Sequence, residues 1–145
     1  MVSSFNHTGL VVQDLDKMTE FYVDVLGLKV LREVDSVAPP QGDHTGVPGA
    51  HRTLRFVGFD NDHQIELVHY IDPPASAGYL DKHQFGAMHI CFNVDDLAAL
   101  HKDLSARGIK FVTDPIFREL PDGATMGIVY AQDPESNWLE FIQGH

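Results

Sequence analysis

Two glutamates stand in short apolar segments of the chain, and two histidines open two other apolar segments. Glu66 lies in QIELVHY and Glu140 in SNWLEFI, whereas His7 and His89 begin HTGLVV and HICFNV. An ionised carboxylate in an apolar strand costs free energy unless it is paired, hydrogen-bonded or bound to a metal ion. Imidazole and carboxylate groups together suit divalent Zn, Ni, Fe, Co or Mn, and two carboxylates offset the charge of the ion. These four residues are therefore candidate ligands of one divalent metal ion.

The candidate ligands recur at corresponding places of an internal repeat. Segment 7–31 resembles segment 89–112, and in each the histidine stands seven positions before an Asp-Leu pair. A strand histidine or glutamate taken alone is more often hydrogen-bonded or solvated than bound to a metal. Because both residue types occur in both copies, the repeat favours the metal-ligand interpretation.

Hydrophobic spacing predicts a strand, a helix and three further strands in each copy. Apolar residues at helical spacing predict helices over 15–26 and 97–104, followed by Gly27 and Gly108 as helix-ending residues. The strands predicted after the helices are 28–34, 52–58 and 64–70 in the first copy and 109–113, 125–131 and 137–142 in the second. The expected fold is α+β, with two βαβββ modules in tandem that form a curved mixed sheet, a cup with its helices on the outer face.

We expect this architecture to form one domain over residues 1–145. The first module covers about 1–71, a linker about 72–87 and the second module about 88–145. The Pro- and Gly-rich stretch 37–50 lengthens the first copy and is predicted to be a loop or lid.

Alternation along the strands predicts which side chains share a face of the sheet. It places His7 and Glu66, and likewise His89 and Glu140, on the face away from the helices. If the repeat brings the two modules together, the four side chains converge inside the cup. Further residues considered for the substrate pocket are Asn93, Cys91 and Trp138 by parity, Tyr130 as a lining aromatic, Tyr70, and Arg55 with His51 as contacts for an anionic substrate.

The composition argues against several classes of partner. The chain has 21 acidic and 10 basic residues and a net charge of −11, which disfavours binding to nucleic acid or to an anionic membrane surface. Cys91 is the only cysteine, which fits a reducing cytosol and excludes a cysteine-cluster metal site. We find no leader peptide and no apolar run of about 18 residues. We therefore expect a cytoplasmic protein that acts on a small molecule.

Three segments of the chain resemble one known superfamily. They are HTGLVVQDLDKMTEFYVDVLGLKV, MHICFNVDDL and DPESNWLEFIQ, and the resemblance to the vicinal oxygen chelate superfamily covers essentially the whole chain. That superfamily includes glyoxalase I, methylmalonyl-CoA epimerase, extradiol dioxygenases and the fosfomycin and bleomycin resistance proteins. The resemblance implies paired βαβββ modules, a homodimer, and a metal ion held by the residues that match the family ligands, which are His7, Glu66, His89 and Glu140.

The ligand set resembles that of glyoxalase I most, with two departures nearby. Glyoxalase I usually has an arginine four residues after its first ligand and an asparagine four residues after its second. Val11 and Tyr70 occupy these places. A valine cannot make the charge-assisted pairing with a carboxylate that arginine makes. We therefore expect a substrate other than a glutathione hemithioacetal.

The reaction that fits these residues is proton abstraction next to a carbonyl, by an isomerase, epimerase or lyase acting on a small metal-chelating oxygenated substrate. The metal ion acts as a Lewis acid. Either Glu140 or Glu66 takes the proton, and the resemblance favours Glu140.

Two alternatives remain at this point. An extradiol-type Fe(II) dioxygenase would use His7, His89 and Glu140 as a facial triad, and Tyr130 resembles the tyrosine of that family's signature. The other alternative is a metal-free protein that binds a drug or antibiotic, as several relatives of this fold do.

Overall fold

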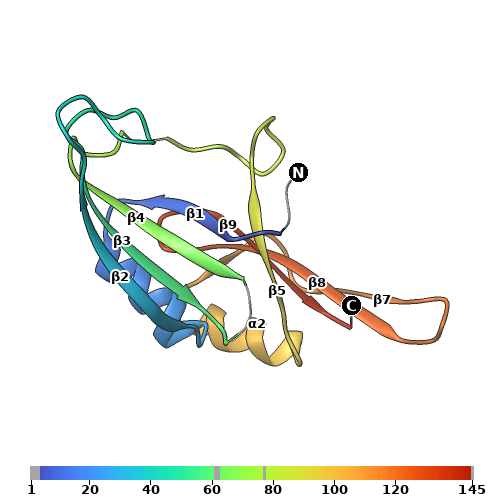
Figure 1. Cartoon of the computed structure of the whole chain (residues 1–145). Coiled ribbons are helices and arrows are strands. Elements are labelled where there is room, and N and C mark those ends of the chain that lie inside the picture. Colours follow the sequence, from blue (N-terminus) through green and yellow to red (C-terminus); the bar gives the residue numbers. More distant parts are fainter. Residues whose placement is uncertain (1–3, 61–62, 77, 145) are drawn as a thin grey trace. The chain divides into compact units, whose positions relative to one another are not determined.

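The computed structural model describes residues 4–60, 63–76 and 78–144 (Figure 1). The chain divides into two compact units, the first ending at residue 77 and the second beginning at residue 78. Each unit has a mixed β-sheet and a helix in the order strand, helix, strands. The predicted α+β class with two βαβββ modules is confirmed.

The first unit has a four-stranded sheet in the order β1-β4-β3-β2. Its elements are β1 (His7–Val12), α1 (Leu15–Glu20), η1 (Phe21–Val25), β2 (Lys29–Val37), β3 (His51–Gly58) and β4 (Gln64–Asp72). Strand β1 pairs with β4 in parallel, and the other neighbours are antiparallel. The first strand of the chain therefore lies directly beside the strand that carries Glu66.

The second unit repeats this topology in the order β5-β9-β8, with β6 and β7 both pairing with β8. Its elements are β5 (His89–Asn93), α2 (Leu97–Ala106), β6 (Lys110–Phe111), β7 (Ile116–Glu119), β8 (Thr125–Gln132) and β9 (Trp138–Gln143). Strand β5 pairs with β9 in parallel, as β1 does with β4. The strand that begins with His89 therefore lies beside the strand that carries Glu140.

Both helices begin in the same way. The side chain of Asp14 accepts a hydrogen bond from the backbone N–H of Lys17 at 3.0 Å, and that of Asp96 accepts one from Ala99 at 2.9 Å. Such a side-chain acceptor satisfies one of the free N–H groups of the first helical turn. The Asp-Leu pair of the repeat is therefore a helix-start signal. The predicted helix over 15–26 is confirmed, with a π-helical turn over Phe21–Val25.

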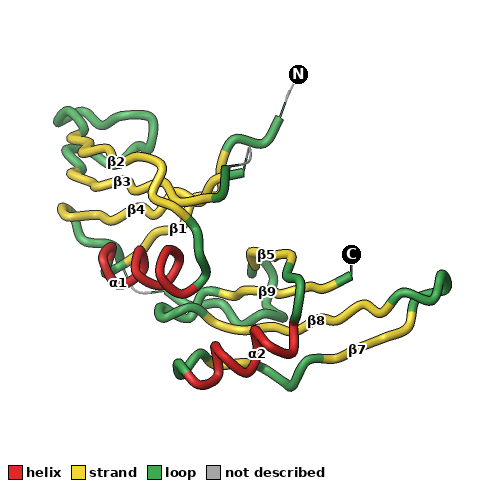
Figure 2. The backbone as a smooth tube through the Cα atoms, turned by 90° about the horizontal axis from the view of Figure 1, so that it is seen from below, coloured by secondary structure: helices red, strands yellow, loops and turns green. Residues whose placement is uncertain are grey.

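The helices cover one face of each sheet and leave the other face to the histidines and glutamates. Figure 2 shows α1 alongside the sheet of the first unit and α2 alongside β8 and β9 in the second. Helix α1 contacts β3 and β4, and α2 contacts β9. Ile65, Leu67, Leu139 and Phe141 are all buried. The alternation that places Glu66 and Glu140 on the opposite face is therefore present in the structure.

One predicted strand is shorter than expected, and a strand that the sequence pattern does not predict follows it. The segment 109–113 is predicted to be one strand, but β6 contains only Lys110–Phe111. The chain then pairs with β8 again as β7. Pro115, which has no backbone N–H to donate to the ladder, stands between β6 and β7.

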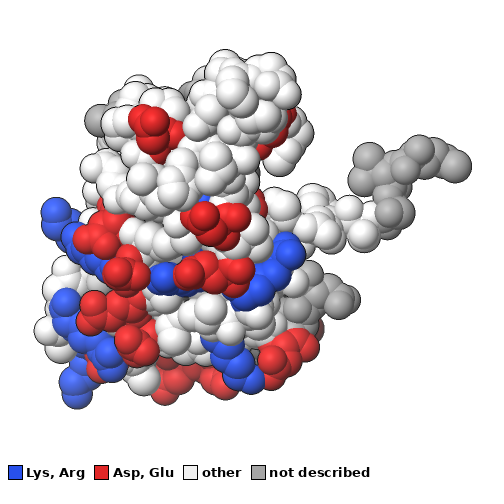
Figure 3. All heavy atoms as spheres, turned by 60° about the vertical axis from the view of Figure 1, so that its left-hand side comes forward, with Lys and Arg blue, Asp and Glu red and all other residues white. Residues whose placement is uncertain are grey.

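Charged side chains on the surface are interspersed rather than separated. On the face drawn in Figure 3, Lys and Arg side chains lie beside Asp and Glu side chains. Among the described residues, no helix is long and apolar enough to cross a membrane.

Candidate metal-binding site

The first candidate pair lies between β1 and β4. His7 Nε2 is 3.2 Å from Glu66 Oε2, and the two side chains are 35% and 17% exposed. The backbone partner of Glu66 on β1 is Gly9, and a side chain there would come within 3.7 Å of the carboxylate. The second ring nitrogen of His7, Nδ1, lies 2.6 Å from the amide oxygen of Asn6. Since only an N–H can donate to that oxygen, this contact assigns the proton of a neutral His7 to Nδ1 and leaves Nε2 toward Glu66.

The second pair has the same geometry in the other unit. His89 Nε2 is 3.0 Å from Glu140 Oε2, and the side chains are 43% and 13% exposed. Glu140 is flanked by Cys91 on β5 and by Tyr130 on β8. The hydroxyl of Tyr130 lies 3.4 Å from His89 Nε2. The predicted pocket residues Cys91 and Tyr130 thus stand on the same face as the second pair.

An aromatic ring lies edge-on to each histidine. The Phe56 ring is 5.7 Å from the His7 ring at an interplanar angle of 90°, and the Tyr130 ring is 5.2 Å from the His89 ring at 63°. Phe56 is the backbone partner of Glu66 as Tyr130 is of Glu140. The repeat thus extends to an aromatic position that the sequence alignment of strands and helices did not reveal.

Burial, together with the negative charge of Glu140, raises the pKa of two neighbouring groups. The pKa of the Cys91 thiol rises to about 11, and the pKa of the Tyr130 phenol is also raised. Both groups therefore keep their protons at neutral pH. The Cys91 thiol can donate a hydrogen bond to Glu140, whereas the Tyr130 hydroxyl lies 3.4 Å from His89 Nε2.

The face that carries His7 and Glu66 in the first unit, and His89 and Glu140 in the second, is called the His/Glu face below. Arg55 does not lie on it. Its guanidinium contacts Asp16 at 3.0 Å and Thr19 at 2.8 Å, both on α1, and Glu33 at 2.6 Å. The structure places Arg55 on the helix face, because it follows the alternation of β3 away from Phe56.

Two further pocket candidates of the first unit have structural partners. His51 Nε2 is 2.7 Å from Asp35 on the neighbouring strand. Tyr70 lies on β4 beside Arg52, whose guanidinium carbon is 5.8 Å from the tyrosine ring centroid. Arg52 is buried and forms an ion pair with Asp43, which belongs to the predicted loop 37–50.

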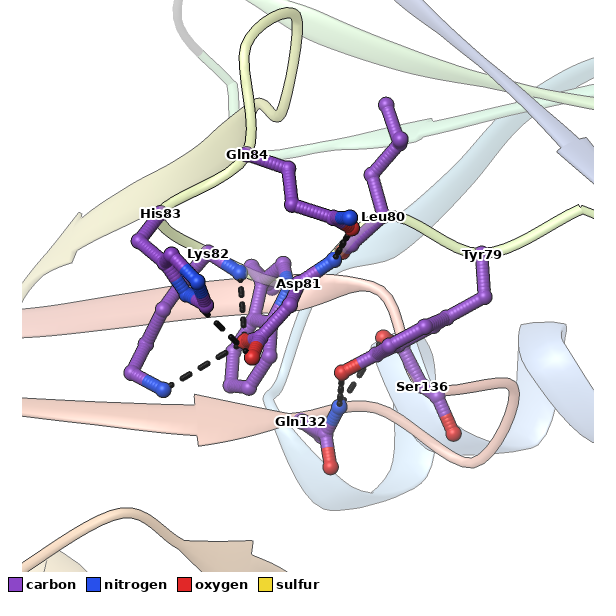
Figure 4. A network of polar contacts seen from close by, with 9 residues as sticks. Tyr79, Leu80, Asp81, Lys82, His83, Gln84, Gln132 and Ser136 are labelled. Carbon is purple, nitrogen blue, oxygen red and sulfur yellow. Dashed lines mark hydrogen bonds and ion pairs between the residues drawn. The ribbon is translucent and has the colours of Figure 1, made fainter.

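Trp138 lies beside His89 on the His/Glu face, but a segment of the predicted linker covers it. We call residues 79–84 the strap. The indole Nε1 donates to the carbonyl of Leu80 at 2.9 Å, and Lys82 Nζ lies 5.1 Å from the ring centroid. Figure 4 shows the polar contacts that hold the strap, including the Tyr79 hydroxyl 3.2 Å from Gln132. Trp138 is therefore only 8% exposed.

Asn93 ends β5 and is exposed. The structure thus brings His7 and Glu66 together, and separately His89, Glu140, Cys91 and Tyr130. Among the described residues, no group of three or more His, Cys, Asp and Glu is arranged so that it could hold a metal ion.

Two βαβββ units, each with a His/Glu pair on the face opposite its helix, define the fold class of the chain. Residues 4–141 match the family described as the Glyoxalase/Bleomycin resistance protein/Dioxygenase superfamily. The chain belongs to this superfamily. Its sequence is 31% identical to lactoylglutathione lyase from Pseudomonas aeruginosa, over 96% of this chain and 81% of that protein.

Other relatives carry a different activity in their names. The chain is 36% identical to mouse mitochondrial methylmalonyl-CoA epimerase, over 75% of this chain and 56% of that protein. Among solved structures, a glyoxalase family protein from Bacillus cereus superposes with a TM-score of 0.86 at 18% identity, over 99% of this chain and 95% of that one. This last likeness confirms the fold alone.

Proposed function

We propose that the protein is a metal-dependent enzyme that removes a proton next to a carbonyl group of a small oxygenated substrate, as an isomerase, epimerase or lyase. The observation that carries this proposal is the pair of His–Glu contacts, 3.2 Å and 3.0 Å long, at equivalent places of two units. Relatives named as lyases and as an epimerase support the reaction class. We place the protein in the cytoplasm as a homodimer.

The two pairs suit a divalent cation. Because Nδ1 of a neutral His7 donates to Asn6, its Nε2 carries a lone pair that faces a carboxylate oxygen 3.2 Å away. A nitrogen lone pair and a carboxylate oxygen repel each other at that distance. A cation or a proton beside both atoms offsets this repulsion and stabilises the contact. Imidazole nitrogen and carboxylate oxygen are also the donor types that Zn, Ni, Fe, Co and Mn accept. We propose that His7, Glu66, His89 and Glu140 jointly hold one such ion.

The metal ion, when bound, supplies Lewis-acid polarisation of substrate oxygens. The protein supplies the base. We assign this role to Glu140, which is 13% exposed and lies between the protic side chains of Cys91 and Tyr130. A carboxylate that is largely screened from water and lies within reach of the substrate can accept a carbon-bound proton as a general base. The thiol of Cys91 stays protonated and can donate a hydrogen bond to it, and the phenol of Tyr130 stays protonated beside His89.

The substrate is proposed to differ from a glutathione hemithioacetal. Val11 follows His7 on β1 with the same parity and is 55% exposed, so its apolar side chain occupies a surface where a carboxylate would need a cation. Tyr70 is engaged with Arg52 rather than free to bind an incoming group.

The first experiment measures metal content and affinity for His7→Ala and His89→Ala beside the wild type. One shared ion predicts that each variant loses metal affinity by at least about 10-fold, since each loses one ligand. His83→Ala is the matched control, because His83 is exposed and pairs with Asp81 of the strap. Metal loss in one variant alone would contradict a shared site.

Co-expression of the two histidine variants tests where the pairs meet. In a homodimer whose sites combine units from two chains, a mixed dimer of His7→Ala and His89→Ala chains regains one intact site. If both pairs come from one chain, the mixed dimer stays metal-free. Metal content of purified mixed dimers separates these outcomes.

The reaction itself is tested by NMR in D₂O. Methylmalonyl-CoA and hemithioacetals of methylglyoxal with several thiols are followed for deuterium uptake at the carbon next to the carbonyl. We expect metal-dependent uptake with at least one of them, and weaker uptake with the glutathione hemithioacetal than with those of smaller thiols. Tight binding of small molecules by metal-free protein, without exchange, would favour the metal-free binding function instead.

A second function is favoured by one contact. The Tyr130 hydroxyl lies 3.4 Å from His89 Nε2, an arrangement suited to positioning a hydroxylated aromatic substrate for an Fe(II) dioxygenase. Oxygen uptake with catechols by the Fe(II)-loaded protein, in the absence of carbonyl C–H exchange, would establish this function in place of the first.

A further inference from the structure

A β-bulge in the first unit changes the face on which one arginine lies. Val30 of β2 pairs with Val57 of β3, but Arg32 pairs with the next β3 residue, Phe56. Two steps along β2 thus match one step along β3. In a regular ladder Leu31 would oppose Phe56 and Arg32 would point to the helix face. The bulge therefore places Arg32 on the His/Glu face.

Arg32 lies close to the first His/Glu pair. Its guanidinium carbon is 3.7 Å above the centroid of the Phe56 ring, and that ring is 5.7 Å from the ring of His7. The guanidinium is thus no farther from the imidazole than the sum of these two distances. Phe56, only 3% exposed, is the surface on which the cation rests.

No carboxylate of the described residues balances the charge of Arg32. In the same unit Arg52 pairs with Asp43 and Arg55 pairs with Asp16 and Glu33. We find no acidic partner within ion-pair distance of Arg32 in residues 4–60, 63–76 and 78–144. In a chain with 21 acidic residues against 10 basic ones, an exposed and unpaired guanidinium is a ready receptor for an anion.

The fold does not require a cation at this place. In the second unit the residue opposite the corresponding aromatic residue is Val112, whose N–H donates to the carbonyl of Tyr130 at 2.9 Å. The second unit therefore has an apolar residue at this place. If Arg32 served only as a cover for Phe56, a leucine or methionine would do so without a charge.

We infer that Arg32 binds a carboxylate or phosphate group of the substrate while the oxygens next to the reacting carbon lie at His7 and Glu66. This inference rests on the proposed function for the position of the reacting end. It narrows the substrate to a small compound with two vicinal oxygens at one end and an anionic group at the other. The planar guanidinium can donate two parallel hydrogen bonds to either anion.

Binding of matched probes tests the inference. The phosphate arm compares dihydroxyacetone phosphate with dihydroxyacetone, and the carboxylate arm compares 2-oxoglutarate with 2-oxopentanoate. Calorimetry with the metal-loaded protein is expected to show, in one arm, at least about 10-fold tighter binding of the member that carries the additional anionic group, a usual size for a charge-assisted contact. The arm with the larger ratio identifies the anion.

Arg32→Met is expected to abolish this preference and leave binding of the member without the additional anionic group unchanged, and Arg32→Lys to restore part of it. Arg107→Met is the matched control, because it removes the same charge from an exposed pair with Asp103 on α2. Equal weakening of both members by Arg32→Met would show a covering role only and would overturn the inference. So would a wild type that binds none of the probes at millimolar concentration.

The exchange assay on the same preparations separates this inference from the proposed reaction. Arg32-dependent anion preference without carbonyl C–H exchange would overturn the reaction and keep the anion site. Metal-dependent exchange without any anion preference would keep the reaction and overturn the role of Arg32.

Discussion

The two His/Glu pairs have almost the same geometry but different neighbours. The distances are 3.2 Å and 3.0 Å, whereas the flanking backbone partners are Gly9 and Phe56 for Glu66 and Cys91 and Tyr130 for Glu140. The first carboxylate therefore has apolar neighbours, and the second has two neighbours that can donate hydrogen bonds. The repeat preserves the candidate ligands and varies what surrounds them, and on this difference we propose that one pair acts on the substrate while the other mainly holds the ion.

The largest expected effect comes from removing the charge of Glu140. Glu140→Gln is expected to slow carbonyl C–H exchange by about 10²- to 10⁴-fold, the usual contribution of a general base. Glu66→Gln is the matched change in the other unit and is expected to weaken metal binding more than it slows the metal-saturated enzyme. Exchange rates are measured at saturating metal, with metal content determined on the same samples.

The opposite result would reverse the assignment. If Glu66→Gln abolishes exchange with metal still bound and Glu140→Gln does not, Glu66 is the base. If both variants lose exchange activity equally and in proportion to their metal content, the role of the base cannot be separated from metal coordination.

A second comparison concerns the hydrophobic cores of the two units. Leu67 and Leu139 are both fully buried, one in each unit. Leu67→Ala and Leu139→Ala are each expected to lower the free energy of unfolding by about 2–5 kcal/mol, because a cavity remains where the side chain was. If the chain is one cooperative domain, both variants shift the same denaturant transition. A biphasic curve in which each variant moves a different phase would show two independently folding units.

Much of this architecture follows from local sequence. The Asp-Leu helix starts, the glycines at 27 and 108 with φ of 82° and 83°, and the alternation around both glutamates depend on neighbouring residues alone. These features were predicted because propensity, capping and burial favour the same local structure. The pairing of His7 with Glu66 followed from parity once the repeat was recognised.

Features that depend on strand register could not be predicted. Regular alternation from Leu28 would not reveal that an extra residue before Arg32 moves its side chain to the His/Glu face. Arg55 was considered for the pocket as a charged residue on a central strand, but its register faces α1. The burial of Trp138 depends on the strap, whose contacts join residues 58 positions apart in the sequence. A bulge or a long-range contact leaves no periodic signal in a single sequence.

A smaller effect is expected from exchanging the aromatic neighbours. Tyr130→Phe removes the hydroxyl near His89 and makes the second pair resemble the first. Losing one hydrogen bond predicts a decrease in exchange rate of about 3- to 10-fold, with metal affinity little changed. Phe56→Tyr, which makes the first pair resemble the second, is expected to leave the rate unchanged if Glu140 is the base. Equal effects of both variants would contradict the division of roles between the pairs.

The smallest expected effect is on stability and comes from the contacts that hold a long connecting segment in each unit. The first unit ties residues 38–50 to β3 through Asp43 and buried Arg52, whereas the second unit ties the strap to Trp138 through a neutral hydrogen bond. Hydrogen bonds from the side chain and backbone of Thr45, together with Arg52, lower the pKa of Asp43 to about 2. The attachment through Asp43 and Arg52 therefore depends on pH in the acidic range, whereas the hydrogen bond between Trp138 and Leu80 does not.

The sign of this dependence follows from the lowered pKa. Because the folded carboxyl ionises more easily than the unfolded one, whose pKa is about 4, its stabilising contribution is complete at neutral pH and is lost as pH falls from about 4 to about 2. Asp43→Asn is therefore expected to melt a few degrees below the wild type at pH 7, and the gap should close progressively below pH 4. Asp60→Asn, which removes an exposed partner of Lys29, is the control and should show a smaller gap throughout. A gap for Asp43→Asn that is the same at pH 3 and pH 7 would mean that the loop is held by its neutral hydrogen bonds, as the strap is, and that the ion pair adds nothing to its attachment.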